Sequence, residues 1–496
     1  MKRIIGLLYL CLLGIPFVSY PLPGDYDGGK DCEKKHDIFY KIENKIKTVF
    51  NDYGLRGDFL IAVVDECGVN GYAVINSNII EGSYTDLNID SPFYIASHTK
   101  AFTGALMCIL DEEGTLDLNK SIADYLPELN LGDGISTADI TLKNLLNHTH
   151  GIFSVRLTWK TAFLGYSGLN SEILEDINND FIYDPSHKFR YSNVGPIVAA
   201  IIAEKVTGKN WKELMREKIF VPLKMEHTSC NVSDYNADLI RPSVIVSRNN
   251  EIISSGFYKK DITMHASGGI ISTTKDLSLW LAANIRQDEI LMNKKSWILL
   301  HSPSALQNRK YFTYDRFGYS LGWDIAEYNG DTILTRFGGY AGISCHISFI
   351  PKKKIGIIAF STDNRAFLLP HLMANYVYNL MSERDAESII ENELAFFREA
   401  FLKQNNLSYP SDSLLLQANN RNDAITGIYQ TDSWPSIEIK KSGNYYNFIW
   451  GVLKGKIYLK DDSSFTTNTG VIIRDFKIKN DTLFTGSLIF IKNMKK

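Results

Sequence analysis

The chain has 496 residues, which is enough for two or three domains with a large core. Hydrophobic residues make up 45% and charged residues 22% of it, as is ordinary for a globular protein. The net charge is −3 and no basic block occurs, so the composition excludes an obvious nucleic-acid partner, and none is predicted.

The N-terminal residues are typical of an export signal. Two basic residues precede an apolar run over residues 4–18, which Pro16 interrupts, and cleavage is expected near Ser19. The run is shorter than the roughly 20 apolar residues that a helix needs to cross a bilayer, so no stable membrane span is expected. We therefore predict a signal peptide over residues 1–19, an exported (periplasmic or secreted) protein, and a loose Gly-, Asp- and Pro-rich leader over residues 20–35.

A helix and a strand pair are predicted next. From His36 an apolar side chain recurs every four residues, which indicates an amphipathic helix. Residues 59–64 and 72–75 are rich in β-branched and aromatic side chains and predict paired strands.

The middle of the chain predicts one α+β unit. Helical and loop segments dominate residues 101–235, strand patterns return after about residue 245, and helical patterns resume over residues 368–404. A helical region between strand-forming ends indicates a sheet with a separate helical lobe. We assign residues 36–385 to this domain.

The C-terminal part predicts a second, smaller domain. Residues 386–423 are assigned to a helical and polar linker, and residues 424–496 to a small antiparallel β domain. The strand-like runs in this tail cover residues 436–439, 445–450, 456–459 and 471–473. Two roles for the tail remain open, namely binding of a partner or wall polymer and restriction of substrate access as a lid.

Ser97 and Lys100 lie three residues apart in the segment from which the functional prediction starts. A largely apolar run over residues 101–110 predicts that a buried helix begins here, and positions i and i+3 share a helix face. A serine hydroxyl needs a neighbouring base to become a nucleophile. Lysine can be that base if its pKa falls by roughly three units from about 10.4. Ser97 and Lys100 are therefore candidate catalytic residues.

A second segment supplies Tyr191 and Asn193, before an apolar helical run over residues 197–202. A tyrosine beside a lysine ammonium ionises more easily and can relay a proton. An asparagine amide can bind a substrate carbonyl. We predict Tyr191 as catalytic and Asn193 as substrate-binding.

A third segment covers residues 336–342, after a strand-like run. Its glycines would let a strand approach a ligand closely, and the backbone N–H groups of Gly339 and Ser97 could form an oxyanion hole. Arg336 could hold a substrate carboxylate through two hydrogen bonds. Arg336, Gly338 and Gly339 are therefore predicted to bind substrate.

Together the three segments resemble the serine β-lactamase-like and penicillin-binding hydrolase family, specifically its class C-like branch. The matching motifs are S-x-x-K, Y-x-N and the glycine segment, and they occur in the right order. The resemblance extends over residues 36–385. Flanking similarity lies in residues 114–118, 125–127, 145–151 and 267–272.

The resemblance implies a β-lactamase/transpeptidase-like fold and an acyl-enzyme mechanism without a cofactor. Ser97 would be the nucleophile, Lys100 and Tyr191 would share the proton transfers, and water would release the acyl group. Asn193 would position the substrate. The family usually carries Lys or His where this chain has Arg336, and arginine does not give up a proton. The difference retains anion binding and weakens the case for β-lactam turnover.

Other reactive side chains receive structural interpretations. Ser320 fits G-x-S-x-G, but a strand-like segment follows it where a nucleophile elbow needs a helix. His98 is expected to pack or face solvent, His148 to make structural hydrogen bonds, and His150 to line the cleft as an alternative to a structural role. No metal-binding spacing and no C-x-x-C pair occurs, and a disulfide cannot be assigned.

These observations predict an exported serine hydrolase that cleaves an amide or ester bond through an acyl intermediate on Ser97. Expected substrates are small molecules or peptides, namely peptidoglycan-type or D-amino-acid peptides, small esters and β-lactams. The alternative is a penicillin-binding or ligand-sensing module on the same fold that does not turn over. The sequence does not predict an oligomeric state.

Overall fold

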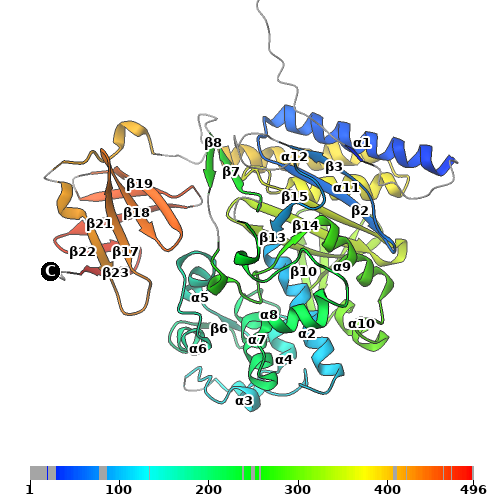
Figure 1. The fold of residues 1–496 in the computed structure, drawn as a ribbon, viewed down its shortest axis with the longest axis horizontal. Coiled ribbons are helices and arrows are strands. Elements are labelled where there is room, and N and C mark those ends of the chain that lie inside the picture. The colour runs from blue at the N-terminus through cyan, green and yellow to red at the C-terminus, as the bar shows by residue number, and fades with distance from the viewer. Residues whose placement is uncertain are drawn as a thin grey trace, which may run out of the picture.

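The computed structural model confirms an α+β domain followed by an all-β domain (Figure 1). The residues that it describes are 19–20, 30–76, 86–132, 135–236, 240–246, 252–255, 259–405, 410–419, 422–461, 463–470 and 472–493.

A nine-stranded antiparallel sheet forms the centre of the first domain, in the order β1-β3-β2-β15-β14-β13-β12-β11-β10. The predicted strand pair is confirmed as β2 and β3, and β2 also pairs with β15, which joins the two ends of the domain. The strands are β1 (Ser19–Tyr20), β2 (Phe59–Asp65), β3 (Gly68–Ile75), β10 (Ala305–Tyr311), β11 (Tyr314–Tyr319), β12 (Asp324–Tyr328), β13 (Asp331–Tyr340), β14 (Ile343–Ile350) and β15 (Ile355–Ser361).

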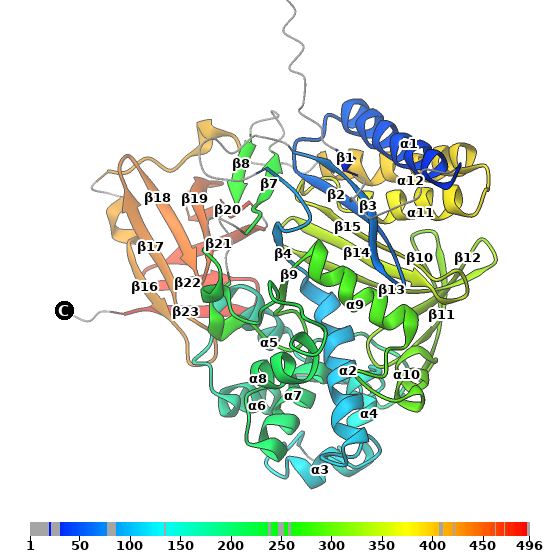
Figure 2. The ribbon, with the colours of Figure 1, turned by 45° about the vertical axis from the view of Figure 1, so that its right-hand side comes forward.

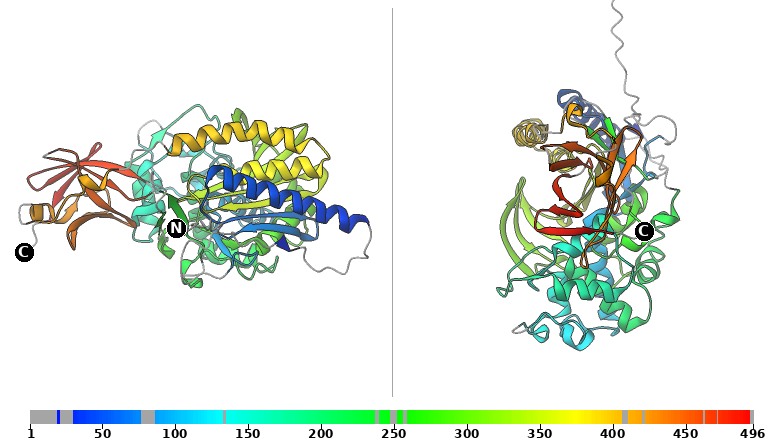
Figure 3. Two further views of the ribbon diagram at one scale, coloured as in Figure 1. Left: turned by 90° about the horizontal axis from the view of Figure 1, so that it is seen from above. Right: turned by 90° about the vertical axis from the view of Figure 1, so that its left-hand side faces the viewer.

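Helices α1 (Lys30–Tyr53), α11 (Leu369–Met381) and α12 (Ala386–Asn405) cover one face of the sheet (Figure 3). Helix α1 begins within the segment predicted as a loose leader, so that prediction is wrong for residues 30–35. Glutamate and lysine are good helix formers, and residues 33–35 extend the helix. Helix α12 packs its apolar face in the same core, so the helical half of residues 386–423 joins this layer.

The helical lobe lies on the other face of the sheet and is built around α2 (Thr99–Glu112) and α7 (Val194–Thr207). Both helices are apolar and buried over most of their length, because other helices surround them. The remaining helices are α3 (Ile122–Tyr125), α4 (Leu142–Leu146), α5 (Val155–Trp159), α6 (Asn170–Asn179), α8 (Trp211–Met215), α9 (Thr274–Arg286) and α10 (Lys294–His301).

Short strand pairs lie outside the nine-stranded sheet. They are β4 (Pro92–Tyr94) with β9 (Ile271–Thr273), β5 (Ile152–Phe153) with β6 (Ile182–Tyr183), and β7 (Ser243–Val246) with β8 (Ile252–Ser255). Among the described residues, no helix has both the length and the apolar character that a membrane crossing requires.

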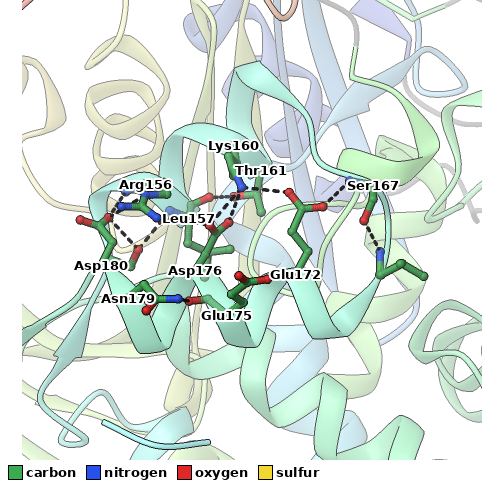
Figure 4. A network of polar contacts seen from close by, with 12 residues as sticks. Arg156, Leu157, Lys160, Thr161, Ser167, Glu172, Glu175, Asp176, Asn179 and Asp180 are labelled. Carbon is green, nitrogen blue, oxygen red and sulfur yellow. Dashed lines mark hydrogen bonds and ion pairs between the residues drawn. The ribbon is translucent and has the colours of Figure 1, made fainter. Parts of the chain in front are cut away.

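A charged network fixes the segment that follows α5 (Figure 4). Lys160 is 7% exposed, and its Nζ lies 2.9 Å from a carboxylate oxygen of Glu172 and 2.7 Å from one of Asp176, both on α6. Arg156 reaches Asp176 and Asp180 at 3.7 Å. Buried charges need partners, so these contacts hold the π-helical turn Lys160–Leu164 against α6.

The C-terminal domain is a closed eight-stranded antiparallel barrel, which confirms the all-β prediction. Alternate side chains such as Ile437, Phe448 and Leu483 fill its interior. Its strands are β16 (Gly427–Gln430), β17 (Ile437–Ser442), β18 (Tyr445–Trp450), β19 (Leu453–Leu459), β20 (Ser464–Asn468), β21 (Ile473–Lys479), β22 (Thr482–Thr485) and β23 (Leu488–Lys492).

Candidate active site

Ser97 lies in the 3-10 turn Ala96–His98, between strand β4 and helix α2. Ala96, just before it, has a left-handed backbone with φ of 45°, a conformation that costs a non-glycine residue about 1–2 kcal/mol. Such local strain is typical of functional sites. The turn brings Ser97 to the wall of a cleft.

Lys100 is the second residue of α2 and is 1% exposed. Its Nζ lies 3.3 Å from Ser97 Oγ, 2.9 Å from Asn193 Oδ1 and 2.6 Å from the carbonyl oxygen of Ser267. The structure thus brings together three residues that the sequence predicted for the site. Ser267, in a segment singled out only for flanking similarity, supplies the third contact.

The surroundings of Lys100 favour a neutral amine. Burial, and then the positive charge of Arg336, hold the pKa of Lys100 well below its ordinary value. A neutral amine has two N–H groups and one lone pair. The two shorter contacts, to Asn193 and Ser267, can take the N–H groups, which leaves the lone pair for the Ser97 hydroxyl proton.

Tyr191 approaches Ser97 from the loop before α7, and its hydroxyl donates to Ser97 Oγ at 2.9 Å. Lys100 Nζ lies 4.8 Å from the centre of its ring. The expectation that the lysine would ease ionisation of this tyrosine is wrong. Burial raises the pKa of Tyr191, although Arg336 and Ser97 oppose that shift, so the phenol stays protonated near neutral pH. Lys100 is therefore the better proton acceptor.

Asn193 precedes the first residue of α7 and makes no capping hydrogen bond with its side chain, whose oxygen instead accepts from Lys100. Among the described residues, it is not one of those that line the cleft. Its predicted contact with substrate stays a prediction.

The histidines near the site make hydrogen bonds that hold the surrounding structure together. His98 is buried and accepts a hydrogen bond from the Trp280 indole at 3.1 Å. His148 accepts from the backbone N–H of Ser192 at 3.4 Å, and its other ring nitrogen lies 3.2 Å from the Tyr319 hydroxyl. Both agree with the structural roles expected from the sequence.

His150 is not among the residues that line the cleft, so the cleft-lining alternative is wrong and the structural role stands. It is fully buried and accepts from the Ile152 N–H at 3.1 Å. Helix α7 packs closely against it, since a Cβ on Gly195 would come 2.9 Å from the His150 Nε2. Ser320 is also buried, in the turn between β11 and strand β12, so it has the strand context expected from the sequence rather than that of a nucleophile elbow.

Arg336 belongs to a charge cluster that the sequence analysis missed. Its Nη1 lies 2.9 Å from one oxygen of Asp324, and Arg316 lies 3.2 Å from the other oxygen. All three are buried, and the Arg336 guanidinium lies 4.6 Å from the centre of the Tyr191 ring. The three side chains together carry a formal charge of +1. Arg336 therefore contributes to the cleft mainly as a fixed positive charge beside Ser97.

Of the two predicted glycines, Gly338 allows β13 to pass close to the nucleophile turn. A Cβ on Gly338 would collide with the carbonyl oxygen of Ile95 and come 2.6 Å from Cys345 Sγ. A Cβ on Gly339 would come 3.4 Å from the Phe367 ring. The close approach at Gly338 explains why a glycine stands there.

The cleft in front of Ser97 has a volume of about 720 Å³. Aromatic side chains from the sheet and the loop after β15 line much of it, together with residues of the barrel. The lining residues are Ser97, Tyr191, Tyr311, Arg336, Phe337, Gly338, Gly339, Tyr340, Ala341, Gly342, Ile343, Asn364, Phe367, Asn468, Gly470 and Ile473. In the described part of the chain, no three His, Cys, Asp or Glu side chains converge to hold a metal ion.

Arg336→Gln is expected to shift the acidic limb of the pH–rate profile upward. Reaction requires neutral Lys100, so activity is lost as pH falls through its pKa. Arg336 lowers that pKa, and its removal raises it. The profile of kcat/KM against pH measures the shift. Arg336→Lys keeps the charge and is the control. An acidic limb at the same pH in all three proteins would contradict the electrostatic role.

Comparison with known proteins identifies a matching family. Residues 42–372 match the protein family described as Beta-lactamase. The chain is 24% identical over 323 residues to the unguisins hydrolase ungD' of Aspergillus campestris, covering 60% of this chain and 57% of that protein. It is 24% identical over 291 residues to protein flp of Staphylococcus aureus, covering 58% and 56%. The chain thus spans a little over half the length of these relatives.

Two solved structures are similar in fold. The octameric penicillin-binding protein homologue from Pyrococcus abyssi superposes with a TM-score of 0.61 at 20% identity, over 92% of this chain and all of that chain. The D-amino acid amidase from Ochrobactrum anthropi SV3 superposes with a TM-score of 0.58 at 18% identity, over 75% of this chain and all of that chain. Because the matched segment covers most of the sequence, this chain belongs to the beta-lactamase family.

Proposed function

We propose that this protein is an exported serine hydrolase that cleaves an amide or ester bond through an acyl intermediate on Ser97. The observation that carries the proposal is the position of Ser97 Oγ, 3.3 Å from a buried lysine amine and 2.9 Å from a tyrosine hydroxyl. Burial, and then the charge of Arg336, lower the pKa of Lys100, which is the direction that a general base needs. The support for export is the N-terminal sequence.

In the first step, Lys100 takes the hydroxyl proton while Ser97 Oγ attacks the substrate carbonyl carbon. The carbonyl oxygen becomes an oxyanion, for which the N–H groups of Ser97 and Gly339 are the proposed donors. The tetrahedral intermediate then expels the leaving amine or alcohol, which receives its proton from Lys100, directly or through the Tyr191 hydroxyl. Water attacks the acyl group in the second half by the same proton path.

Substrates with an apolar or aromatic group next to the scissile bond fit the cleft best. Tyr311, Phe337 and Phe367 offer ring surfaces, and the charge of +1 on the arginine cluster favours a nearby anion or carbonyl dipole. The D-amino acid amidase with the same fold has been crystallised with L-phenylalanine amide. An amino-acid amide or peptide is therefore our first candidate, with a small ester as the second.

A penicillin-binding or ligand-sensing module remains the second candidate. Arg336 occupies the position at which the family usually has Lys or His, and Asp324 and Tyr191 hold it in place. A fixed arginine offers no proton for release of the acyl group. If deacylation is slow, the reaction stops at a lasting acyl adduct on Ser97.

Turnover of three probes tests the proposal. We expect the wild-type protein to hydrolyse D-phenylalaninamide or p-nitrophenyl butyrate faster than a chromogenic cephalosporin, and Ser97→Ala to lose about a thousand-fold or more of that activity. Full activity in Ser97→Ala would contradict the proposal. Acylation by the cephalosporin without turnover of any probe would favour the sensing module.

A further inference from the structure

The barrel is joined to the catalytic domain by an aromatic and cationic contact. The ring centres of Trp450 and Trp159 are 5.9 Å apart in a stacked arrangement. The Arg474 guanidinium lies 5.0 Å from the first ring and 5.7 Å from the second. Such cation–π contacts gain strength where water is excluded. The contact fixes β21, which carries Arg474, relative to the helical lobe.

The backbone at the end of β18 adds a second connection. The Val452 N–H donates to the carbonyl oxygen of Phe163 at 2.8 Å. Gly451 has φ of 63°, and a Cβ on it would collide with that same oxygen. This close approach requires glycine, since a side chain would separate the two backbones.

The same connection leads directly to the cleft. Phe163 stacks on Tyr340, with ring centres 5.7 Å apart and 17° between the planes. The Tyr340 hydroxyl donates to the carbonyl oxygen of Ala162 at 3.2 Å. Tyr340 lines the cleft, so Phe163 links the barrel backbone at Val452 to a strand of the active site.

Three barrel residues themselves line the cleft in front of Ser97: Asn468, Gly470 and Ile473. Asn468 ends β20, Ile473 begins β21 and Gly470 lies between the two strands, which are on the side of the barrel that faces the catalytic domain (Figure 2). The Asn468 side chain accepts the Gly470 N–H at 2.8 Å and fixes the local backbone. Ile473 is 39% exposed, an apolar side chain left open to the cleft.

We propose that Asn468, Gly470 and Ile473, the barrel wall, form the far side of the substrate site and set how large an acyl group the enzyme accepts. The sheet supplies Tyr311 and Phe367 on one side of the cleft, and Ile473 supplies apolar surface from the other domain. A volume of about 720 Å³ closed in this way holds a small amide or ester. Longer acyl groups meet the barrel wall.

This inference rests on the proposed function, and the test separates the two. Ile473→Trp enlarges the wall side chain, and Ile473→Ala reduces it. Ile489→Trp is the matched control, because Ile489 is an exposed isoleucine of the barrel that does not line the cleft. The readout is the ratio of kcat/KM for p-nitrophenyl octanoate to that for p-nitrophenyl acetate.

We expect Ile473→Trp to lower this ratio about ten-fold, Ile473→Ala to raise it, and Ile489→Trp to leave it at the wild-type value. Equal ratios in all four proteins would overturn the barrel wall, as would an equal fall in Ile489→Trp. Inactivity of the wild type toward both esters would instead count against the proposed function.

Binding tests the barrel wall without turnover. Calorimetric titration of octanamide and butyramide into Ser97→Ala is compared with titration into Ser97→Ala/Ile473→Trp and Ser97→Ala/Ile489→Trp. Selective weakening of octanamide binding by Ile473→Trp supports the wall. No selective weakening, including no binding of either amide, overturns it.

Discussion

Replacing Lys100 with methionine is expected to lower kcat/KM about 10²–10⁴-fold, the usual contribution of a general base. Methionine keeps the apolar stem but has no lone-pair nitrogen to accept the Ser97 proton. The loss also leaves the partly buried Asn193 oxygen and the buried Ser267 carbonyl oxygen without their donor, and the buried oxygen alone costs about 1–3 kcal/mol when unpaired. Initial rates, together with thermal melting, measure the two effects separately.

Lys100→Arg is the matched variant. It retains a cation beside Ser97 but cannot be deprotonated at accessible pH. A loss similar to that of the methionine variant would assign the effect to the base. Retention of more than a tenth of wild-type activity by Lys100→Arg would contradict the role of Lys100 as proton acceptor.

Replacing Asp324 with asparagine is expected to lower the free energy of unfolding by about 3–5 kcal/mol, the usual cost of breaking a buried ion pair. Asp324 is 1% exposed and is the carboxylate between Arg316 and Arg336. Its removal leaves two buried cations facing each other. Urea unfolding at neutral pH measures the change.

A surface ion pair provides the control for Asp324. Glu128 and Lys205 lie 2.9 Å apart and are about half exposed, so Glu128→Gln is expected to cost less than about 1 kcal/mol. Equal losses in the two variants would contradict the account of the buried cluster.

Some contacts between the site residues could be predicted from the sequence, and others could not. Ser97 and Lys100 could be placed together from the sequence because one helical turn joins them. Tyr191 lies 94 residues from Ser97, and only the resemblance to a family predicted their contact. The position of Lys100 between Asn193 and the Ser267 carbonyl depends on packing of three distant segments, which no local pattern encodes.

Other parts depend on strand register and long-range pairing. Asp324 lies beside Arg336 because β12 pairs with β13, with Asp324 opposite Thr335, and the sequence does not specify that register. The strand-like runs of the tail predicted strands, but closure of the barrel needs β16 to pair with β23. The barrel residues of the cleft were missed for the same reason. The cleft-lining alternative for His150 could not be ruled out from the sequence because its burial under α7 is a tertiary property.

Intact-mass measurement after incubation with a fluorophosphonate and a fluorescent penicillin tests the central claim most directly. The account predicts one stoichiometric adduct on the wild-type protein, located at Ser97 by peptide mapping, and no adduct on Ser97→Ala. Rapid loss of a penicillin adduct would identify β-lactam turnover, and a lasting one would favour a peptidase or sensor. An adduct on Ser97→Ala, or none on the wild type with either probe, would contradict the claim that Ser97 is the nucleophile.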